Sequence, residues 1–365
     1  MDMMYVEDCC EILDSMRVPI TASDREEGEY PYYGANGIQD HVADYIFDDE
    51  LVLLAEDGGN FGSKERPIAY RVSGKCWVNN HAHVLKPKAG LDVDYLCYSL
   101  MFYKVDGMVN GATRQKLTQA AMRKMKIPSR SMNEQLHIVD ELNRILKIKE
   151  QRQQELTLLD DLIKARFVEL FGEQKINPFG FEKTTIGDSC TLKSGTSLPA
   201  DKENEGGDIP YVKVGDMNFP GNERYITTSS RFVSEDTAGK GLFDVGSIIF
   251  PKRGGAIGTN KKRMTVLPIC ADLNVMGVTS NGSLLPEYLL AYFDMIDMGA
   301  LSDGSSVPQI NNKNIAPLDI LLPPIELQNQ FADFVHQVDK SKVVVQKALD
   351  ETQLLFDSLM QEYFG

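Results

Sequence analysis

The chain has 365 residues, a length typical of two or three domains, and a formal net charge of −15 at pH 7. This acidity argues against a protein that coats nucleic acid through its overall charge, although it leaves room for local basic patches. Six cysteines without a CxxC pair, no signal peptide and no run of about 18 apolar residues predict a cytoplasmic protein with no membrane contact.

Short strands and helices separated by turns are predicted through most of the chain. We expect strands at 51–55, 76–85, 247–251 and 275–280, separated by clusters of Gly, Asn, Asp and Pro. Short helices are expected at 95–103 and 288–292. The mixture predicts α/β domains rather than a purely helical or purely β protein.

Two longer segments, 132–171 and 325–364, have apolar residues at helical spacing. Pro128 and Pro323-Pro324 stand just before them, where one element ends and a helix can begin. A helix of about 40 residues is a rod of roughly 60 Å. Such a rod needs a second one to bury its apolar stripe.

The second half of the chain repeats the first. Leu170-Phe171-Gly172 returns as Tyr363-Phe364-Gly365 at an offset of 365 − 172 = 193, and the same offset joins Gln135 to Gln328. Nearer the N-terminus the offset drifts, but Gly58-Gly59-x-x-Gly62 still corresponds to Gly254-Gly255-x-x-Gly258. Repeats of this length are whole domains.

The repeat and the elements together predict an α+β fold of two tandem mixed α/β domains and two long helices. We expect the domains at 1–131 and 173–323, and the long helices at 132–172 and 324–365. Two rods of equal length bury most surface side by side. We therefore expect an antiparallel coiled coil and a pseudo-twofold relationship between the halves.

Catalytic motifs for phosphate-loop, dinucleotide and serine-hydrolase chemistry are missing from the sequence. Asn177-Pro178-Phe179 is similar to part of an adenine methyltransferase motif, but it lacks a proline and is interpreted as a linker turn. His81 and His83 are expected on one face of a strand. A packed or hydrogen-bonded strand face is favoured there over a nucleic-acid contact, and a metal site, which lacks a third ligand, comes last.

The two glycine loops differ in charge. In the second half, Lys252 and Arg253 precede the glycines and Lys261-Lys262-Arg263 follows them, which favours contact with DNA phosphates or guanine edges. The first half has Glu56-Asp57 instead. These carboxylates either accept a hydrogen bond from cytosine or face solvent, and we favour the second alternative. We expect the nearby Lys64 and Arg66 to supply the cations of the first half instead.

A further pair of segments, 111–117 and 304–310, joins hydroxyl, amide and cationic residues in a turn before a helix. Thr113, Ser305 and Ser306 are expected to cap, whereas Arg114 and Lys116 are better candidates for contact. The candidate DNA-binding residues of the whole chain are Lys64, Arg66, Asn79, Asn80, His81, Arg114, Lys116, Lys252, Arg253, Lys261, Lys262, Arg263, Gln309 and Lys313.

Taken together, the chain resembles the specificity (S) subunits of type I restriction-modification systems. The resemblance rests on the order of domain, helix, domain, helix, on Gly304-Ser305-Ser306-x-Pro308-Gln309-Ile310, and on Leu321-Leu322-Pro323-Pro324-Ile325-Glu326-x-Gln328. It covers essentially the whole chain. The first half departs from it at Gln115 and at Arg130-Ser131, and resembles another variety of target recognition domain through Glu56-Asp57-Gly58-Gly59 and Trp77-Val78-Asn79-Asn80-His81.

The resemblance implies a non-catalytic protein that reads a bipartite, asymmetric DNA target, one half-site per target recognition domain. Its partners would be double-stranded DNA, two methyltransferase (M) subunits and two restriction (R) subunits. The chain itself would need no cofactor, because the M subunits bind S-adenosylmethionine. The rods would set the spacing of the half-sites, so four residues inserted into each should lengthen the spacer.

Two alternatives stay open. One is the specificity subunit of a related system whose methyltransferase and nuclease form a single polypeptide. The other is a coiled-coil scaffold whose α/β domains bind proteins, which would leave the basic residues without a role.

Overall fold

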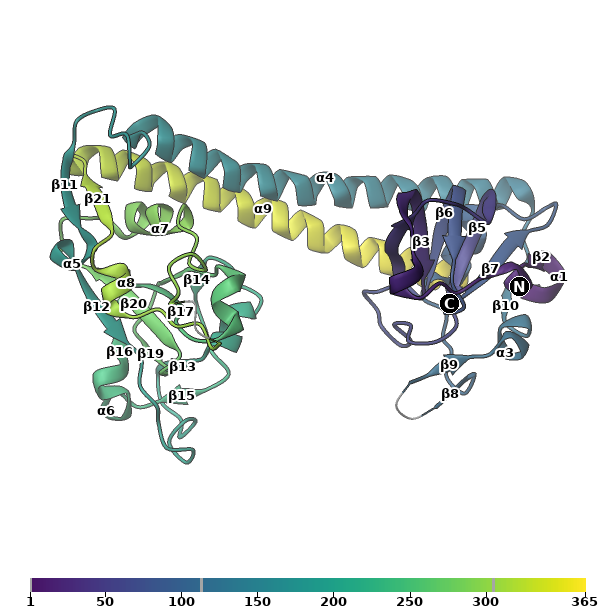
Figure 1. Cartoon of the computed structure of the whole chain (residues 1–365), viewed down its shortest axis with the longest axis horizontal. Helices are drawn as coiled ribbons and strands as arrows, with labels where there is room; N and C mark the ends of the chain where they lie inside the picture. Colours follow the sequence, from purple (N-terminus) through teal and green to yellow (C-terminus); the bar gives the residue numbers. More distant parts are fainter. Residues whose placement is uncertain (1, 112–113, 304–305) are drawn as a thin grey trace. The chain divides into compact units, whose positions relative to one another are not determined.

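The computed structural model describes residues 2–111, 114–303 and 306–365 (Figure 1). These residues form two compact units, the first comprising Met1–Gln153 with Lys347–Gly365 and the second Gln154–Gln346. Each unit holds one mixed domain and parts of the long helices α4 (Met132–Phe171) and α9 (Ile325–Phe364). The predicted α+β fold with two long helices is confirmed.

The first unit is built on a six-stranded sheet of order β2-β7-β5-β6-β3-β4. Neighbouring strands are antiparallel except for the parallel pair β3 and β6. In chain order the strands are β2 (Cys10–Ile12), β3 (Glu27–Gly34), β4 (Gly37–Val42), β5 (Phe47–Ala55), β6 (Ala69–Val78) and β7 (Ala82–Pro87). Two short ladders pair β1 (Met3–Tyr5) with β10 (Lys126–Pro128) and β8 (Val109–Asn110) with β9 (Lys116–Leu117).

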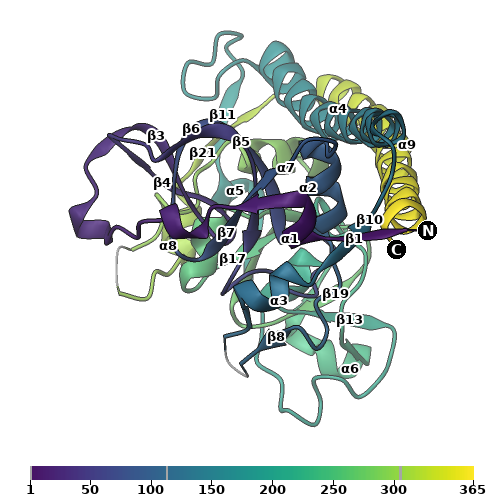
Figure 2. The same cartoon turned by 90° about the vertical axis from the view of Figure 1, so that its right-hand side faces the viewer.

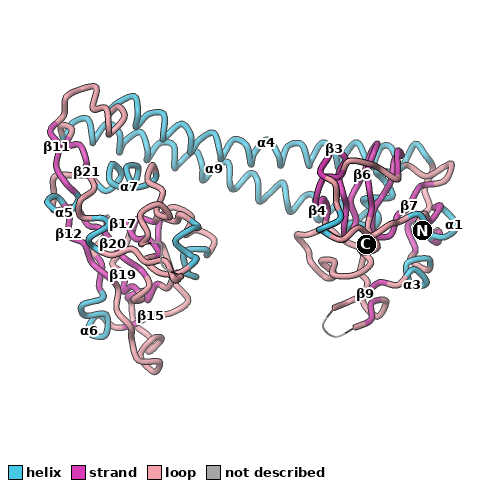
Figure 3. Tube along the Cα trace, in the orientation of Figure 1, coloured by secondary structure: helices cyan, strands magenta, loops and turns pink. Residues whose placement is uncertain are grey.

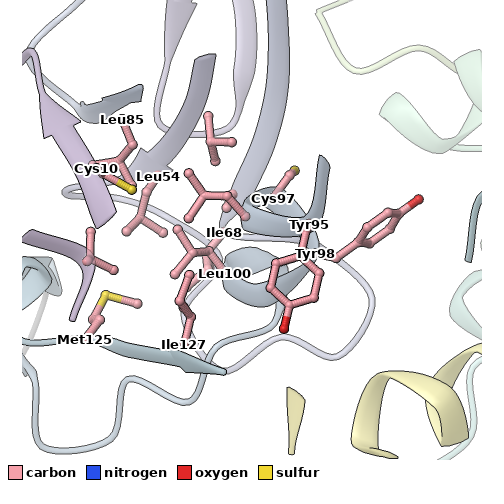
Figure 4. Close-up of a cluster of buried hydrophobic side chains, with 14 of the residues drawn as sticks. Cys10, Leu54, Ile68, Leu85, Tyr95, Cys97, Tyr98, Leu100, Met125 and Ile127 are labelled. Atoms are coloured by element: carbon pink, nitrogen blue, oxygen red, sulfur yellow. The ribbon is translucent and has the colours of Figure 1, made fainter. Parts of the chain in front are cut away.

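Strand β5 is apolar along its second half because both of its faces are covered. Val52 and Leu54 enter one hydrophobic cluster and Leu51 and Leu53 another, and all four are fully buried. Helix α2 (Val93–Met101) belongs to the first cluster, which Figure 4 shows. Asp92 caps this helix by accepting a hydrogen bond from the Tyr95 amide at 2.9 Å.

The second unit contains a five-stranded sheet of order β12-β20-β17-β18-β14 and a four-stranded sheet of order β15-β13-β19-β16. The strands are β12 (Cys190–Ser194), β13 (Ile209–Val212), β14 (Tyr225–Ile226), β15 (Phe232–Val233), β16 (Leu242–Phe243), β17 (Ile248–Pro251), β18 (Arg263–Thr265), β19 (Ile269–Ala271) and β20 (Val275–Ser280). A separate ladder pairs β11 (Glu182–Thr185) with β21 (Asp319–Leu322). Loops form much of this unit (Figure 3).

Shorter helices complete both units. The α-helices are α1 (Val6–Cys9), α3 (Gln119–Arg123), α5 (Ile186–Ser189), α6 (Glu235–Ala238), α7 (Pro286–Asp294) and α8 (Asn312–Ile315). The 3-10 helices are η1 (Asp14–Met16), η2 (Ala22–Asp24), η3 (Val214–Asn218), η4 (Gly239–Gly241) and η5 (Gly255–Thr259). Among the described residues, none of the helices has the length and apolar character that a membrane span requires.

Helices α4 and α9 pack antiparallel within each unit. In the first unit the Tyr363 hydroxyl donates to Glu141 at 2.6 Å, and ten residues earlier on α9 Gln353 accepts a hydrogen bond from Lys149. In the second, Lys342 pairs with Asp160 at 2.8 Å. Figures 1 and 2 show the two helices side by side.

An aromatic cluster fixes the helices of the second unit on its domain. It consists of Phe167 and Phe171 from α4, Tyr288 from α7 and Phe331 from α9, with contacting ring centroids 4.7 to 5.6 Å apart. All four side chains are fully buried. Their burial stabilises α4 and α9 against the domain, since buried aromatic pairs add to the hydrophobic term.

Two local predictions have different outcomes. The single strand predicted at 76–85 is wrong, because a turn divides it into the end of β6 and the start of β7, which lie on opposite sides of β5. The turn predicted at Asn177-Pro178-Phe179 is confirmed. Asn177 has φ 49° and both atoms of its side-chain amide hydrogen-bond the backbone of Phe181.

Candidate nucleic-acid interface

Each unit holds its glycine loop in the same backbone frame. In the first glycine loop (56–62) the Leu117 amide donates to the Glu56 carbonyl at 2.7 Å, and the Gly58 amide donates to Gln115 at 3.4 Å. In the second glycine loop (252–258) the corresponding bonds join Ile310 to Lys252 at 2.9 Å and Gly254 to Pro308 at 2.8 Å. The two loops are therefore equivalent in structure as well as in sequence.

The equivalence extends to the pairs of residues that face each other. Asp57 forms an isolated β-bridge with Lys116, and Arg253 forms one with Gln309. The glycine that follows has φ 64° at Gly58 and 71° at Gly254, a left-handed conformation that favours glycine. The same turn thus carries an acidic residue in one unit and a basic one in the other.

The acidic side chains of the first loop are occupied by cations. Asp57 Oδ1 is 2.8 Å from Arg114 Nη2 and 2.7 Å from His81 Nδ1. Glu56 pairs with Arg17 at 2.6 Å and with Lys116 at 2.9 Å. The prediction that these carboxylates face solvent is therefore wrong, because Glu56 is buried and Asp57 is only 17% exposed at its side chain.

A buried polar network lies below this loop. His83 Nδ1 is 2.7 Å from Asp14 Oδ2, and its Nε2 is 2.9 Å from the Leu117 carbonyl oxygen. Burial by itself raises the pKa of Asp14, but hydrogen bonds and the charge of His83 outweigh burial, so the pKa lies below its ordinary value. Burial opposes ionisation of Glu56 as well, and hydrogen bonds from Arg17 and Lys116 still hold its pKa below the ordinary value.

Asp14, Glu56 and His83 bring their ligand atoms within 4.8 Å of one another, a spacing that suits a metal ion. The carboxylates instead accept hydrogen bonds from Arg17 and Gln119, and both ring nitrogens of His83 have partners. The atoms that could bind a metal ion are therefore already hydrogen-bonded to other groups of the protein. The hydrogen-bonded interpretation of His83 is confirmed, whereas His81 precedes β7 and bonds Asp57 in the loop.

The second loop presents two cations, Lys252 and Arg253, that form no ion pair within the part of the chain that the structure describes. Arg253 is exposed, and its side chain forms no hydrogen bond or ion pair with residues 2–111, 114–303 or 306–365. Lys252 is half-buried and donates to Ser194 Oγ at 2.8 Å. Burial lowers the pKa of Lys252, and the charge of Arg253 lowers it further.

Most of the chain matches one protein family, described as the type I restriction modification DNA specificity domain. The match covers residues 1–158 and 178–352. The chain belongs to this family.

Similar proteins share both the family and the fold of this specificity chain. A putative type I restriction enzyme specificity subunit of Haemophilus influenzae is 26% identical over 362 residues, which are 98% of this chain and 92% of the relative. The EcoprrI specificity subunit of Escherichia coli is 23% identical over 109 residues, 30% of this chain and 26% of the relative.

Two solved structures each align with 100% of this chain and 96% of their own. A type I restriction-modification S subunit from M. genitalium has a TM-score of 0.57 at 15% identity. A structure concerning complex assembly and conformational transition of the type I restriction-modification system has a TM-score of 0.59 at 16% identity. At these identities the likeness shows a common fold.

Three predicted contact residues of this specificity chain are used inside the fold. Lys262 is 5% exposed and donates to Asn260 Oδ1 and to the Ile296 carbonyl at 2.8 and 2.7 Å. Arg263 donates to the carbonyls of Lys262 and Met217. Asn79 is 3% exposed and bonds Gln39 and the His81 amide. The burial of Lys262 and Asn79 contradicts the prediction that they contact DNA at the surface. The guanidinium of Arg263 is hydrogen-bonded to two backbone carbonyls.

The other predicted residues lie at or near the surface. Lys64, Arg66, Asn80 and Lys313 are exposed, Gln309 is half-buried, and Lys261 contacts Asn218. Arg114 and Lys116 pair with the carboxylates of the first loop, and the prediction that Lys64 and Arg66 supply cations there stays a prediction. The capping predicted for Thr113 and Ser305 lies outside the described residues.

The residues that organise the first loop were missed by sequence reasoning. Asp14 and Arg17 are separated from Glu56 by about 40 positions in the sequence. For Asp57 a signal existed, namely the exchange of Glu56-Asp57 for Lys252-Arg253 in the repeat. Buried or half-buried carboxylates beside cations indicate ordered ion pairs.

Proposed function

We propose that this chain is the DNA-reading subunit of a type I restriction-modification complex, with no catalytic role of its own. Each domain would contact one half of a bipartite, asymmetric target. The observation that carries this proposal is the repeated frame: one turn, held by the same backbone hydrogen bonds, bears Asp57 in one unit and Arg253 in the other. Equivalent frames with different side chains suit two different half-sites.

Side-chain chemistry at the two loops supports contact with DNA. Lys252 and Arg253 supply positive charge next to a glycine turn, which suits phosphate or guanine contact. In the first unit, exposed Arg114 and Lys116 supply cations beside the equivalent turn. Local patches of this kind are compatible with a net charge of −15 if partner subunits contribute further phosphate contacts.

The proposed partners are two M subunits, which would bind S-adenosylmethionine and methylate adenine, and two R subunits. No cofactor is proposed for this chain. Exposed apolar side chains on the long helices support docking of the M subunits there: Leu136, Ile148, Leu158, Leu162 and Val168 on α4, and Val343, Val344, Leu354 and Leu355 on α9. Since the target is chromosomal or invading DNA, the proposal implies a cytoplasmic protein.

Selection from a random duplex library tests this proposal. The chain is purified with its M partner, bound duplexes are recovered, and their sequences are compared with the starting library. The proposal predicts enrichment of two short conserved elements separated by a spacer of fixed length. A protein-binding scaffold predicts no enrichment, and that result would refute DNA reading.

A further inference from the structure

Arg114 is an exposed side chain whose position is nevertheless fixed. Its Nη2 atom lies 2.8 Å from Asp57 Oδ1, and the same oxygen lies 2.7 Å from His81 Nδ1. Arg114 Nη2 and His81 Nδ1 are 3.4 Å apart, so the three groups form a compact triangle. Asp57 is held in turn by the His81 contact, and its own side chain is only 17% exposed.

The guanidinium also lies against the glycine turn. A Cβ atom added to Gly58 would stand 3.5 Å from both Nε and Nη2 of Arg114 and 3.9 Å from its Cζ. Because the Cζ atom is the farthest of the three, the Nε–Nη2 edge of the guanidinium is the part that faces Gly58. The backbone of Arg114 leaves room only for glycine at position 111. A Cβ atom added to Gly111 would come within 2.4 Å of the Arg114 carbonyl oxygen.

The fixed guanidinium keeps most of its hydrogen-bond donors. It has five N–H groups, and the contact with Asp57 uses one on Nη2. The side chain is 60% exposed, and the contacts with Asp57 and Gly58 involve Nη2 and Nε, so the Nη1 side of the planar fork is the part that a ligand could reach. Arg253, at the second loop, has no such support among the residues that the structure describes.

We infer that Asp57 is a specificity-determining positioning residue that holds Arg114 to read a guanine of the first half-site through its O6 and N7 atoms. The inference deepens the proposed function and rests on it. A planar fork matches the two acceptors of guanine, and a pre-oriented fork loses little freedom on binding.

Charge favours guanine over phosphate as the ligand. Asp57 faces Arg114 and Glu56 faces Lys116, so the first loop is close to neutral overall. A nearby carboxylate weakens attraction to a phosphate group much more than it weakens hydrogen bonds to a neutral base edge. Arg253 at the second loop forms no ion pair with a carboxylate of the described residues, which suits phosphate contact there.

The experiment uses the complex of the full chain with its M partner and duplexes of the selected target. Each guanine of the first half-site is replaced in turn by 7-deazaguanine, which lacks the N7 acceptor, and adenine methylation is measured. We expect one replacement to lower kcat/KM of the wild-type complex by a factor on the order of ten. The Arg114→Lys complex, which keeps the charge but loses the fork, should be insensitive to that replacement.

The role of Asp57 is tested by Asp57→Asn alone and together with Arg114→Lys. Asp57→Asn should reduce discrimination at that guanine while increasing affinity for non-target DNA, because a negative charge is removed. In the Arg114→Lys background the same substitution should cause no further loss of discrimination, since Asp57 acts through Arg114. Asp49→Asn is the matched control, as Asp49 pairs with Lys86 elsewhere in the unit and should not alter discrimination.

Several results would overturn the inference. These are a wild-type complex insensitive to every 7-deazaguanine in the first half-site, an Arg114→Lys complex with unchanged discrimination, or an additive effect of Asp57→Asn in the double variant. Loss of discrimination at the second half-site in Arg114→Lys would also contradict it. Failure of the proposed function would look different, because the wild-type complex would then select no bipartite target at all.

Discussion

Gln135 and Gln328 stand at equivalent positions of the repeat and make the same set of three hydrogen bonds. In each, Oε1 accepts from a backbone amide just before a short helix, and Nε2 donates to two backbone carbonyls. The partners are Asp92, Gly90 and Arg130 for Gln135, and Leu285, Ser283 and Pro323 for Gln328, at 2.7 to 3.1 Å. Each glutamine thereby fixes the first turn of a long helix to its own domain.

Truncation of either glutamine should destabilise its own unit. Gln135 and Gln328 are 0% and 1% exposed, so alanine would remove three hydrogen bonds to the backbone and leave a buried gap, at a cost of about 2 kcal/mol. Trp77, the single tryptophan, lies in β6, so its fluorescence reports unfolding of the first unit. Gln135→Ala should shift that transition to lower urea concentration.

The control variants come from the exposed faces of the same helices. Gln151→Ala and Gln330→Ala should change stability by less than about 0.5 kcal/mol. Gln328→Ala should lower the melting temperature of the protein while moving the Trp77 transition less than Gln135→Ala does. Equal shifts of the Trp77 transition by both variants would contradict separate anchoring.

Arg253→Ala should weaken methylation at the second half-site and leave the sequence preference at the first unchanged. Arg253 is exposed and has no partner among the residues that the structure describes, so the change should not alter stability. If Arg253 contacts a phosphate, the slope of log binding constant against log salt should fall by about 1. Equal loss of selectivity at both half-sites would show that the domains do not read independently.

Lys262→Ala should lower stability without weakening contact with DNA, the reverse of the effect expected for Arg253→Ala. Lys262 donates to Asn260 and to the Ile296 carbonyl from a buried position, and burial lowers its pKa. Its loss should lower the melting temperature, with a cost of about 1–3 kcal/mol for the unsatisfied Ile296 carbonyl, and should leave the salt slope unchanged. A reduced salt slope with unaltered stability would restore Lys262 as a DNA contact.

Acid should weaken the first unit through Asp14 and Glu56. Folding lowers both pKa values, so their stabilisation is complete above the ordinary values of 3.8 and 4.5 and is lost as pH falls through the folded-state values. Glu56→Gln should destabilise by about 3 kcal/mol at pH 7. The difference from the wild type should shrink below about pH 4.5 as Glu56 becomes protonated in the wild type.

Urea unfolding followed by Trp77 fluorescence between pH 7 and 3 measures this difference. Glu11→Gln, at an exposed carboxylate of the same unit, serves as the control and should match the wild type throughout. A gap between Glu56→Gln and the wild type that stays constant with pH would argue that Glu56 does not contribute as an ionised group.

Periodicity and repetition were sufficient to predict the long helices and the paired domains. The apolar spacing of α4 and α9 is local information, and the offset of 193 that joins Gln135 to Gln328 is read directly from the sequence. The strand at 76–85 was mispredicted because apolar residues continue through a turn, and only the sheet order shows that β5 lies between β6 and β7.

Side-chain roles at the loops were harder to predict because they depend on distant partners. The sequence predicts a surface cation at Lys262, whereas the fold places the Ile296 carbonyl within hydrogen-bond distance of its ammonium group. Glu56 looks solvent-exposed until Arg17, 39 positions away, covers it. Composition identifies charges, but only tertiary structure shows which charges are neutralised.

We propose that one backbone frame, used twice, reads two different half-sites. Co-expression of this chain with its M partner, followed by mapping of modified adenines across the host genome, tests it most directly. We expect a single asymmetric bipartite motif whose two parts differ in sequence and are separated by a spacer of constant length. A contiguous motif, two identical half-sites, or no sequence preference would contradict it.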